Sequence, residues 1–89
     1  METTVSQQAI EQEIRQFVIA NFLFGTDDGR LSSDESFLEN GIIDSTGVLE
    51  LVSFLEQTYQ VKVRDDELVP DNLDSLRKVT AFVQRKLNQ

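Results

Sequence analysis

The sequence predicts an all-α protein: a small four-helix bundle of three long helices and one short helix, with a long first loop. Apolar residues recur at helical spacing in three separate stretches of the chain. Strand-like alternation is confined to residues 61–63, and no second strand candidate is available to pair with it. With 89 residues, the chain has room for one domain, which we assign to residues 1–89.

The first helix is predicted over residues 6–24. Its apolar stripe consists of Ile10, Ile14, Phe17, Val18 and Phe22. Thr4 or Ser6 is expected to cap its start, and Gly25 is expected to end it in a left-handed conformation.

A long connection follows over residues 25–44, with the sequence GTDDGRLSSDESFLENGIID. It opens with turn-forming residues. Its apolar residues are predicted to anchor it to the core: Leu31, Phe37, Leu38, Ile42 and Ile43. A loop of this length in so small a domain is usually functional.

The second helix is predicted over residues 45–59, and Asp44 is its expected N-cap. One face of this helix carries Val48, Leu51, Val52, Leu55 and Tyr59. Val61 and Val63 are interpreted as part of an extended connector that buries both side chains.

The remaining helical segments are a short one and a long one. Residues 65–73 are predicted to form one or two short helical turns interrupted by Pro70. Residues 75–87 are predicted to form the last long helix, with Asp74 as its cap. Its apolar face consists of Leu76, Val79, Phe82, Val83 and Leu87.

The composition excludes several classes of function. The chain has no cysteine and no histidine, so it lacks disulfides, thiolate metal sites, a thiol nucleophile and the commonest general base. The carboxylate pairs do not have the spacing of a calcium-binding loop, and no metal site is expected. No acid–base set converges in the sequence, which makes an enzyme the weakest interpretation.

The net charge of −8 is concentrated in the middle of the chain. From Asp27 to Glu56 there are eight acidic residues and a single basic one, Arg30. An acidic surface repels nucleic acid and anionic lipid and attracts basic protein surfaces. Neither a signal peptide nor a membrane-length apolar stretch is visible. We therefore expect a cytoplasmic monomer that binds proteins and neither nucleic acid nor membranes.

Asp44 and Ser45 stand where the long loop meets the second helix. If Asp44 caps the helix, Ser45 takes the first helical position and its hydroxyl is free. The helix N-terminus beside it carries partial positive charge, which would stabilise an attached phosphate. The alternative is that Ser45 is itself the N-cap, a common role for serine.

The string SFLENGIIDSTGVLELVSFLEQTYQVKV resembles the attachment region of the acyl carrier and peptidyl carrier protein family. The resemblance extends from Ile10 to Leu87 and includes the Phe37-Leu38 pair and the final LDSLRKV. It implies that Ser45 receives 4′-phosphopantetheine from coenzyme A, flanked by Asp44. The arm would hold an acyl or aminoacyl group as a thioester, and the chain itself would do no catalysis.

The resemblance also implies partners. These are a phosphopantetheinyl transferase, an adenylate-forming ligase or acyltransferase that loads the arm, and a downstream biosynthetic enzyme. The expected contact residues are Thr46, Leu49, Glu50, Phe54 and Glu56. For Leu49 and Phe54 the alternative is packing under the long loop and the short helix.

Two departures from the family pattern G-x-D-S-L stand out. Gly41 lies one residue further from Ser45, and Thr46 replaces the usual leucine, with Gly47 behind it. Because the residue after the serine often touches partner enzymes in the family, this favours a specialised stand-alone carrier over a general fatty-acid-synthesis carrier. The cargo stays open among fatty acyl, hydroxyacyl and aminoacyl groups. The rival function is a small helical protein–protein interaction module without a prosthetic group.

Overall fold

The computed structural model describes residues 7–23, 25 and 31–88. Its elements are α1 (Gln7–Phe22), α2 (Ser45–Tyr59), the 3₁₀ turn η1 (Asp65–Glu67), α3 (Pro70–Leu73) and α4 (Leu76–Leu87). The all-α bundle of three long helices and one short helix is therefore confirmed. Thr4, Ser6 and Phe24, and most of the turn at the start of the long loop, lie outside the described residues.

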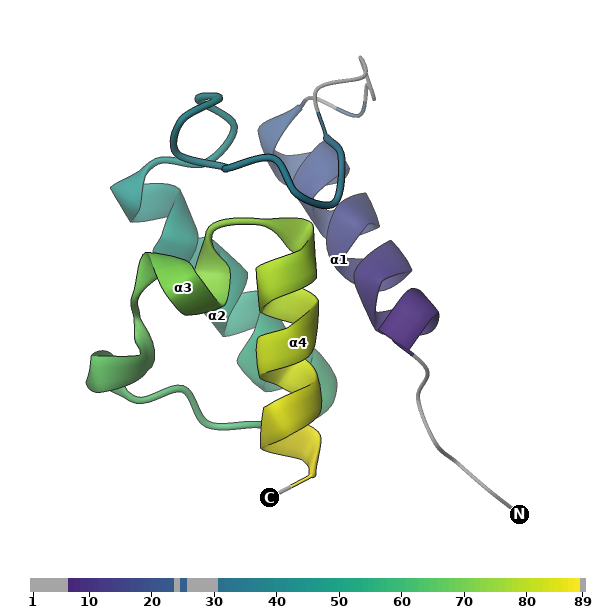
Figure 1. Ribbon diagram of the computed structural model, residues 1–89, viewed down its shortest axis with the longest axis vertical. Coiled ribbons are helices and arrows are strands. Elements are labelled where there is room, and N and C mark those ends of the chain that lie inside the picture. Colours follow the sequence, from purple (N-terminus) through teal and green to yellow (C-terminus); the bar gives the residue numbers. More distant parts are fainter. Residues whose placement is uncertain (1–6, 24, 26–30, 89) are drawn as a thin grey trace.

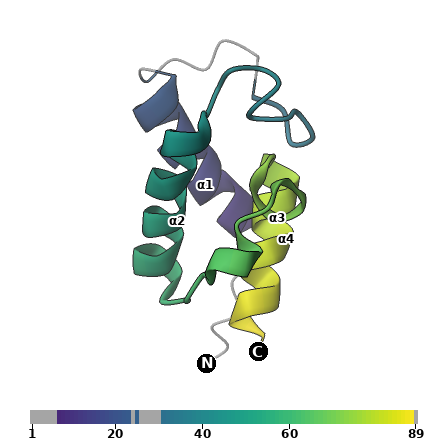
Figure 2. The same ribbon diagram turned by 90° about the vertical axis from the view of Figure 1, so that its left-hand side faces the viewer.

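The helices enclose one core, and α4 contacts each of the other three α-helices (Figure 1). Helix α4 packs most extensively on α1, then on α3, and least on α2. Figure 2 shows α2 on one side of the bundle and α3 with α4 on the other. Residues 31–44 cross one end of the bundle and enter α2 from there.

The core confirms most of the apolar stripes. The buried members of these predicted stripes are Ile10, Ile14, Val18, Leu51, Leu55, Leu76, Val79, Phe82 and Val83. The loop adds Leu31, Phe37, Ile42 and Ile43. Each fully buried side chain of this kind contributes about 1.5–3 kcal/mol. The expectation of burial was wrong for Val61 and Val63, which are half-buried because the connector runs along the surface.

Aromatic rings join α2 to α1 at the edge of the core. The Phe54 ring stacks on Phe17, with 4.2 Å between centroids, and meets Tyr59 edge-on at 6.4 Å. The Tyr59 hydroxyl donates a 2.6 Å hydrogen bond to Glu13 Oε1 on α1. Burial, and then the neighbouring Glu13 carboxylate, raise the pKa of Tyr59 above its ordinary value.

The helix ends match the local sequence, with two corrections. Gly25 adopts a φ of 80°, and its N–H donates to the Ile19 carbonyl at 2.9 Å, which confirms the left-handed stop after α1. Pro70 begins α3 instead of interrupting it, because the first helical position needs no N–H. The predicted cap of α4 was wrong: Ser75, not Asp74, accepts the Lys78 N–H at 3.1 Å.

Asp74 instead ties the long loop to the junction of α3 and α4. Its Oδ1 accepts the Leu38 N–H at 3.0 Å, and its backbone carbonyl accepts the Phe37 N–H at 2.8 Å. The Ser36 hydroxyl donates to the other carboxylate oxygen. With Phe37 buried beneath, these bonds hold the segment 36–38 in one place. The side chain of Leu38 points outward and is 46% exposed, so its predicted anchoring in the core was wrong.

Glu67 ties η1 to the last helix. Its Oε1 accepts the Arg64 N–H at 2.9 Å, and both carboxylate oxygens accept from Lys86 Nζ at 2.9 and 3.1 Å. The Arg64 backbone bond, and then the Lys86 ammonium, lower the pKa of Glu67 below its usual range.

Candidate functional site

Asp44 caps α2 as predicted. Its backbone is extended, its Oδ1 accepts the Gly47 N–H at 2.7 Å, and its carbonyl accepts the Val48 N–H at 3.0 Å. Ser45 is therefore the first residue of the helix, and the alternative in which it is the cap is wrong. The Ser45 side chain is exposed, and within the described part of the chain its hydroxyl makes no hydrogen bond.

The start of α2 suits a phosphate attached to Ser45. The Ser45 and Thr46 amides precede the first intrahelical bond, so they have no acceptor within the helix. The aligned peptide dipoles of this 15-residue helix add partial positive charge at the same end. A phosphodiester on Ser45 would thus meet free N–H donors and a favourable dipole, and the residues present fit a phosphopantetheine arm.

Gly47 faces inward at the same turn. A Cβ at this position would lie 2.8 Å from Phe22 Cε1, closer than real Cβ atoms approach, and 3.0 Å from Ile43 Cγ2, a tight contact. The glycine therefore allows α2 to come close to the end of α1. Of the Thr46-Gly47 pair, only Thr46 is exposed, so the departure from the family pattern reaches the surface at a single residue.

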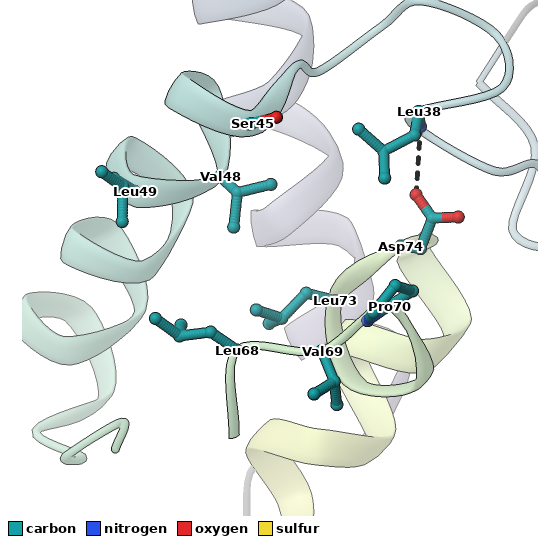
Figure 3. A pocket seen from close by; sticks show the side chains of 9 residues that line it. All are labelled: Leu38, Ser45, Val48, Leu49, Leu68, Val69, Pro70, Leu73 and Asp74. Carbon is teal, nitrogen blue, oxygen red and sulfur yellow. Dashed lines mark hydrogen bonds between the residues drawn. The ribbon is translucent and has the colours of Figure 1, made fainter. Parts of the chain in front are cut away.

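A pocket of about 250 Å³ opens beside Ser45, between α2 and the segment that enters α3 (Figure 3). Its described lining residues are Leu38, Ser45, Val48, Leu49, Leu68, Val69, Pro70, Leu73 and Asp74. Among these, Asp74 alone carries a charge. In Figure 3 the Ser45 hydroxyl turns toward the side of the pocket where Leu38 lies. The attachment hydroxyl and an apolar hollow therefore share one surface.

Three exposed apolar side chains form the rim of this pocket: Leu38, Leu49 and Val69, which are 46%, 59% and 40% exposed. They come from the long loop, α2 and the residues before α3. Among the described residues, one other large apolar side chain is exposed, Leu87 at the end of α4. Leu49 therefore does not pack under the long loop; it stands in solvent beside Ser45.

The other expected contact residues divide into two groups. Thr46 and Glu50 are exposed on the first turns of α2, near Ser45 and Leu49. Phe54 is stacked on α1, away from the long loop and the short helix, and Glu56 Oε2 accepts the Val63 N–H at 2.9 Å. Both of these side chains have a structural role within the chain. All five remain predictions as contacts for a partner.

Two kinds of feature are absent from the described residues. No group of acidic side chains there has the arrangement of a metal site. None of the helices in that part of the chain combines the length and apolar character of a membrane span.

A family model described as the phosphopantetheine attachment site matches residues 21–83. The match covers well over half of the chain, and the chain belongs to this family. Its prosthetic group is 4′-phosphopantetheine, and the chain is a carrier of acyl or aminoacyl groups for biosynthesis.

Individual relatives agree with that assignment. A probable acyl carrier protein, PigG, of Serratia sp. is 33% identical over 85% of this chain and 86% of its own length. An acyl carrier protein of Akkermansia muciniphila is 26% identical over 91% and 96%. A D-alanyl carrier protein of Lactococcus lactis subsp. cremoris is 29% identical over 82% and 92%.

The sequence reasoning missed the pocket and its rim. Leu68, Val69 and Leu73 lie in a segment interpreted only as short helical turns. Asp74 was predicted to cap α4 because an acidic residue before a helix is a common N-cap. No local signal separated the exposed Leu38 from the buried Phe37, since the adjacent loop residues Ile42 and Ile43 are both buried.

Proposed function

We propose that Ser45 is the residue that carries the phosphopantetheine arm, and that the chain presents this arm to other enzymes without catalysing a reaction itself. One observation supports this most directly. The exposed Ser45 hydroxyl is free of hydrogen bonds within the described chain, because Asp44 has taken over the capping of α2. The arm supplies the thiol that this cysteine-free chain lacks.

Attachment joins Ser45 Oγ to the phosphorus of the pantetheine phosphate. The hydroxyl gives up its proton, the pyrophosphate bond of coenzyme A is cleaved, and the nucleotide half departs with its own phosphate. The chain contributes an accessible hydroxyl, the two unpaired amides of the first turn and the helix dipole. The base that takes the proton belongs to the transferase.

The test is a measurement of mass. The purified chain is incubated with coenzyme A and a broad-specificity phosphopantetheinyl transferase, and the expected result is the mass gain of one arm. Ser45→Ala should keep the helical circular dichroism spectrum, since Asp44 still caps α2, and should gain no mass. Ser53→Ala is the matched control, because Ser53 is exposed on the same helix. An unmodified wild-type chain would favour the interaction-module alternative, and a modified Ser45→Ala variant would refute the site.

We also propose a specialised role, with loading by a dedicated adenylate-forming ligase or acyltransferase. The supporting residue is Thr46, which places a short polar side chain beside the attachment serine. A partner shaped for leucine there would lose a contact worth about 1.5–3 kcal/mol if fully enclosed, or roughly 10- to 100-fold in affinity. A fatty acid condensing system should therefore elongate chains poorly on the wild type and better on Thr46→Leu. Efficient elongation on the wild type would refute the specialised role.

A short acyl or aminoacyl cargo fits this proposal. The pocket beside Ser45, at about 250 Å³, lies below the usual volume of pockets for drug-sized ligands, about 300–1,000 Å³. We expect the dedicated ligase to load such a cargo faster than a long fatty acid, as measured by mass spectrometry of the armed protein. A cytoplasmic monomer remains the expected state, and size-exclusion chromatography tests the monomer.

A further inference from the structure

Each residue of the pocket rim has an exposed acidic neighbour. Glu39 follows Leu38, Glu50 follows Leu49, and Asp71 stands two residues after Val69. An apolar rim bordered by carboxylates is complementary to a surface that carries an apolar side chain and basic residues around it. We assign this rim as the binding site for such a surface on the enzyme that modifies Ser45.

Leu38 differs from Leu49 in how it is held. Leu49 belongs to a regular helix, whereas Leu38 lies in a loop that crosses the end of the bundle. Its N–H is bonded to Asp74 Oδ1 at 3.0 Å, which Figure 3 shows as a dashed line. Asp74, 36 residues further along the chain, accepts the Leu38 N–H, while the Leu38 carbonyl accepts the Gly41 N–H at 3.2 Å within the loop.

We propose that Asp74 is a positioning residue for partner recognition: its carboxylate holds Leu38 at the rim of the pocket beside Ser45. The inference rests on the proposed function, since the partner is the enzyme that attaches the arm. Without the carboxylate the Leu38 N–H loses its acceptor and the segment 36–38 loses two of its ties. Leu38 then no longer adds a fixed apolar contact to the rim.

Two substitutions at Asp74 distinguish the positioning of Leu38 from the effect of the negative charge of Asp74. Asp74→Ala removes both acceptor oxygens. Asp74→Asn keeps a carbonyl oxygen for the Leu38 N–H, and its amide can donate to the Ser36 hydroxyl, which also accepts. The bonds survive and only the charge is lost. The control Asp34→Ala removes a carboxylate and its exposed ion pair with Arg77 from the same loop but leaves Leu38 untouched.

The assay is steady-state transfer of the arm by a broad-specificity transferase, below the unfolding temperature of every variant. Leu38→Ala should raise the KM for the carrier about 3- to 10-fold at constant kcat, because roughly half of this side chain is free to be covered. Asp74→Ala should raise KM by a similar factor, and the double variant should add little to either. Asp74→Asn and Asp34→Ala should stay near the wild-type KM.

A second measurement needs no partner enzyme. Amide hydrogen exchange at Leu38, followed by NMR in the chain without its arm, should accelerate in Asp74→Ala and stay slow in Asp74→Asn. The proposal is overturned if Asp74→Ala leaves KM or the exchange at Leu38 unchanged. It is also overturned if Asp74→Asn raises KM as much as Asp74→Ala, because the negative charge of Asp74 would then be what the transferase recognises. An increase in KM in the double variant equal to the two single effects combined would overturn it as well. A wild-type chain that accepts no arm refutes the proposed function instead, and the exchange data still decide whether Asp74 positions Leu38.

Discussion

Replacing Gly47 with alanine tests whether the close approach of α2 to α1 is required. Two effects oppose each other. Alanine is the better helix former by about 0.8–1 kcal/mol. Its Cβ, however, would lie 2.8 Å from the Phe22 ring and 3.0 Å from the Ile43 side chain. Overfilling of this kind costs about 1–3 kcal/mol.

The second effect should dominate because the two contacts differ in freedom. Phe22 is half-buried at the end of α1, whereas Ile43 is 1% exposed and enclosed by the core. The expected result is a net loss of about 0.5–2 kcal/mol in the free energy of unfolding. For a domain of this size each lost kcal/mol lowers Tm by roughly 4–8 °C.

Urea denaturation followed by circular dichroism measures this loss. Thr46→Ala is the matched control, because it adds helix propensity at an exposed neighbouring position and should not destabilise the chain. In a Phe22→Ala background the cost of Gly47→Ala should shrink, since one of the two crowded contacts is gone. A Gly47→Ala variant as stable as the wild type, or more stable, would refute the packing argument.

Three other substitutions have expected outcomes of known sign. Thr80→Val should raise the free energy of unfolding by about 1 kcal/mol, because the buried Thr80 hydroxyl has no hydrogen-bond partner in the described chain; a loss in thermal denaturation would contradict this. Glu67→Gln should lose less stability than the wild type as the pH falls through the folded-state pKa of Glu67. A carboxylate whose pKa is lowered by folding stabilises the fold fully above its unfolded-state pKa and loses that stabilisation as the pH falls, and denaturation at several pH values tests it. Glu56→Ala should cost about 1–2 kcal/mol by leaving the Val63 N–H unpaired, whereas Glu50→Ala should change stability by less than about 0.5 kcal/mol; equal losses on urea denaturation would refute the distinction.

The sequence was most informative where one local rule decides the outcome. Helical periodicity located the three long helices, and Asp44 followed by a helical stripe identified the cap and thereby the free serine. Gly25 ended α1 because few other residues adopt a positive φ without strain. These features depend on near neighbours in the chain, whereas the attachment role of Ser45 was implied by the resemblance of the surrounding sequence to the carrier family.

The sequence was least informative where two local solutions compete or distant segments meet. Asp74 and Ser75 both have the chemistry of a cap, and tertiary contacts with the loop decided between them. The inward orientation of Gly47 depends on Phe22, which is 25 residues earlier in the chain. The pocket combines residues from the loop, α2 and α3, so no local pattern could have revealed it.

The modest packing of α2 has a consequence for motion. Of its 15 residues, Gly47, Leu51 and Leu55 are buried, and α4 contacts it less than it contacts α1 or α3. Detaching this helix would uncover Leu51 and Leu55 and break the Phe17–Phe54 stack, but we expect it to require less free energy than unfolding the whole chain. We therefore expect α2 to open before the unit formed by α1, α3 and α4. The residue proposed to bear the arm would then stand on the helix that we expect to move first.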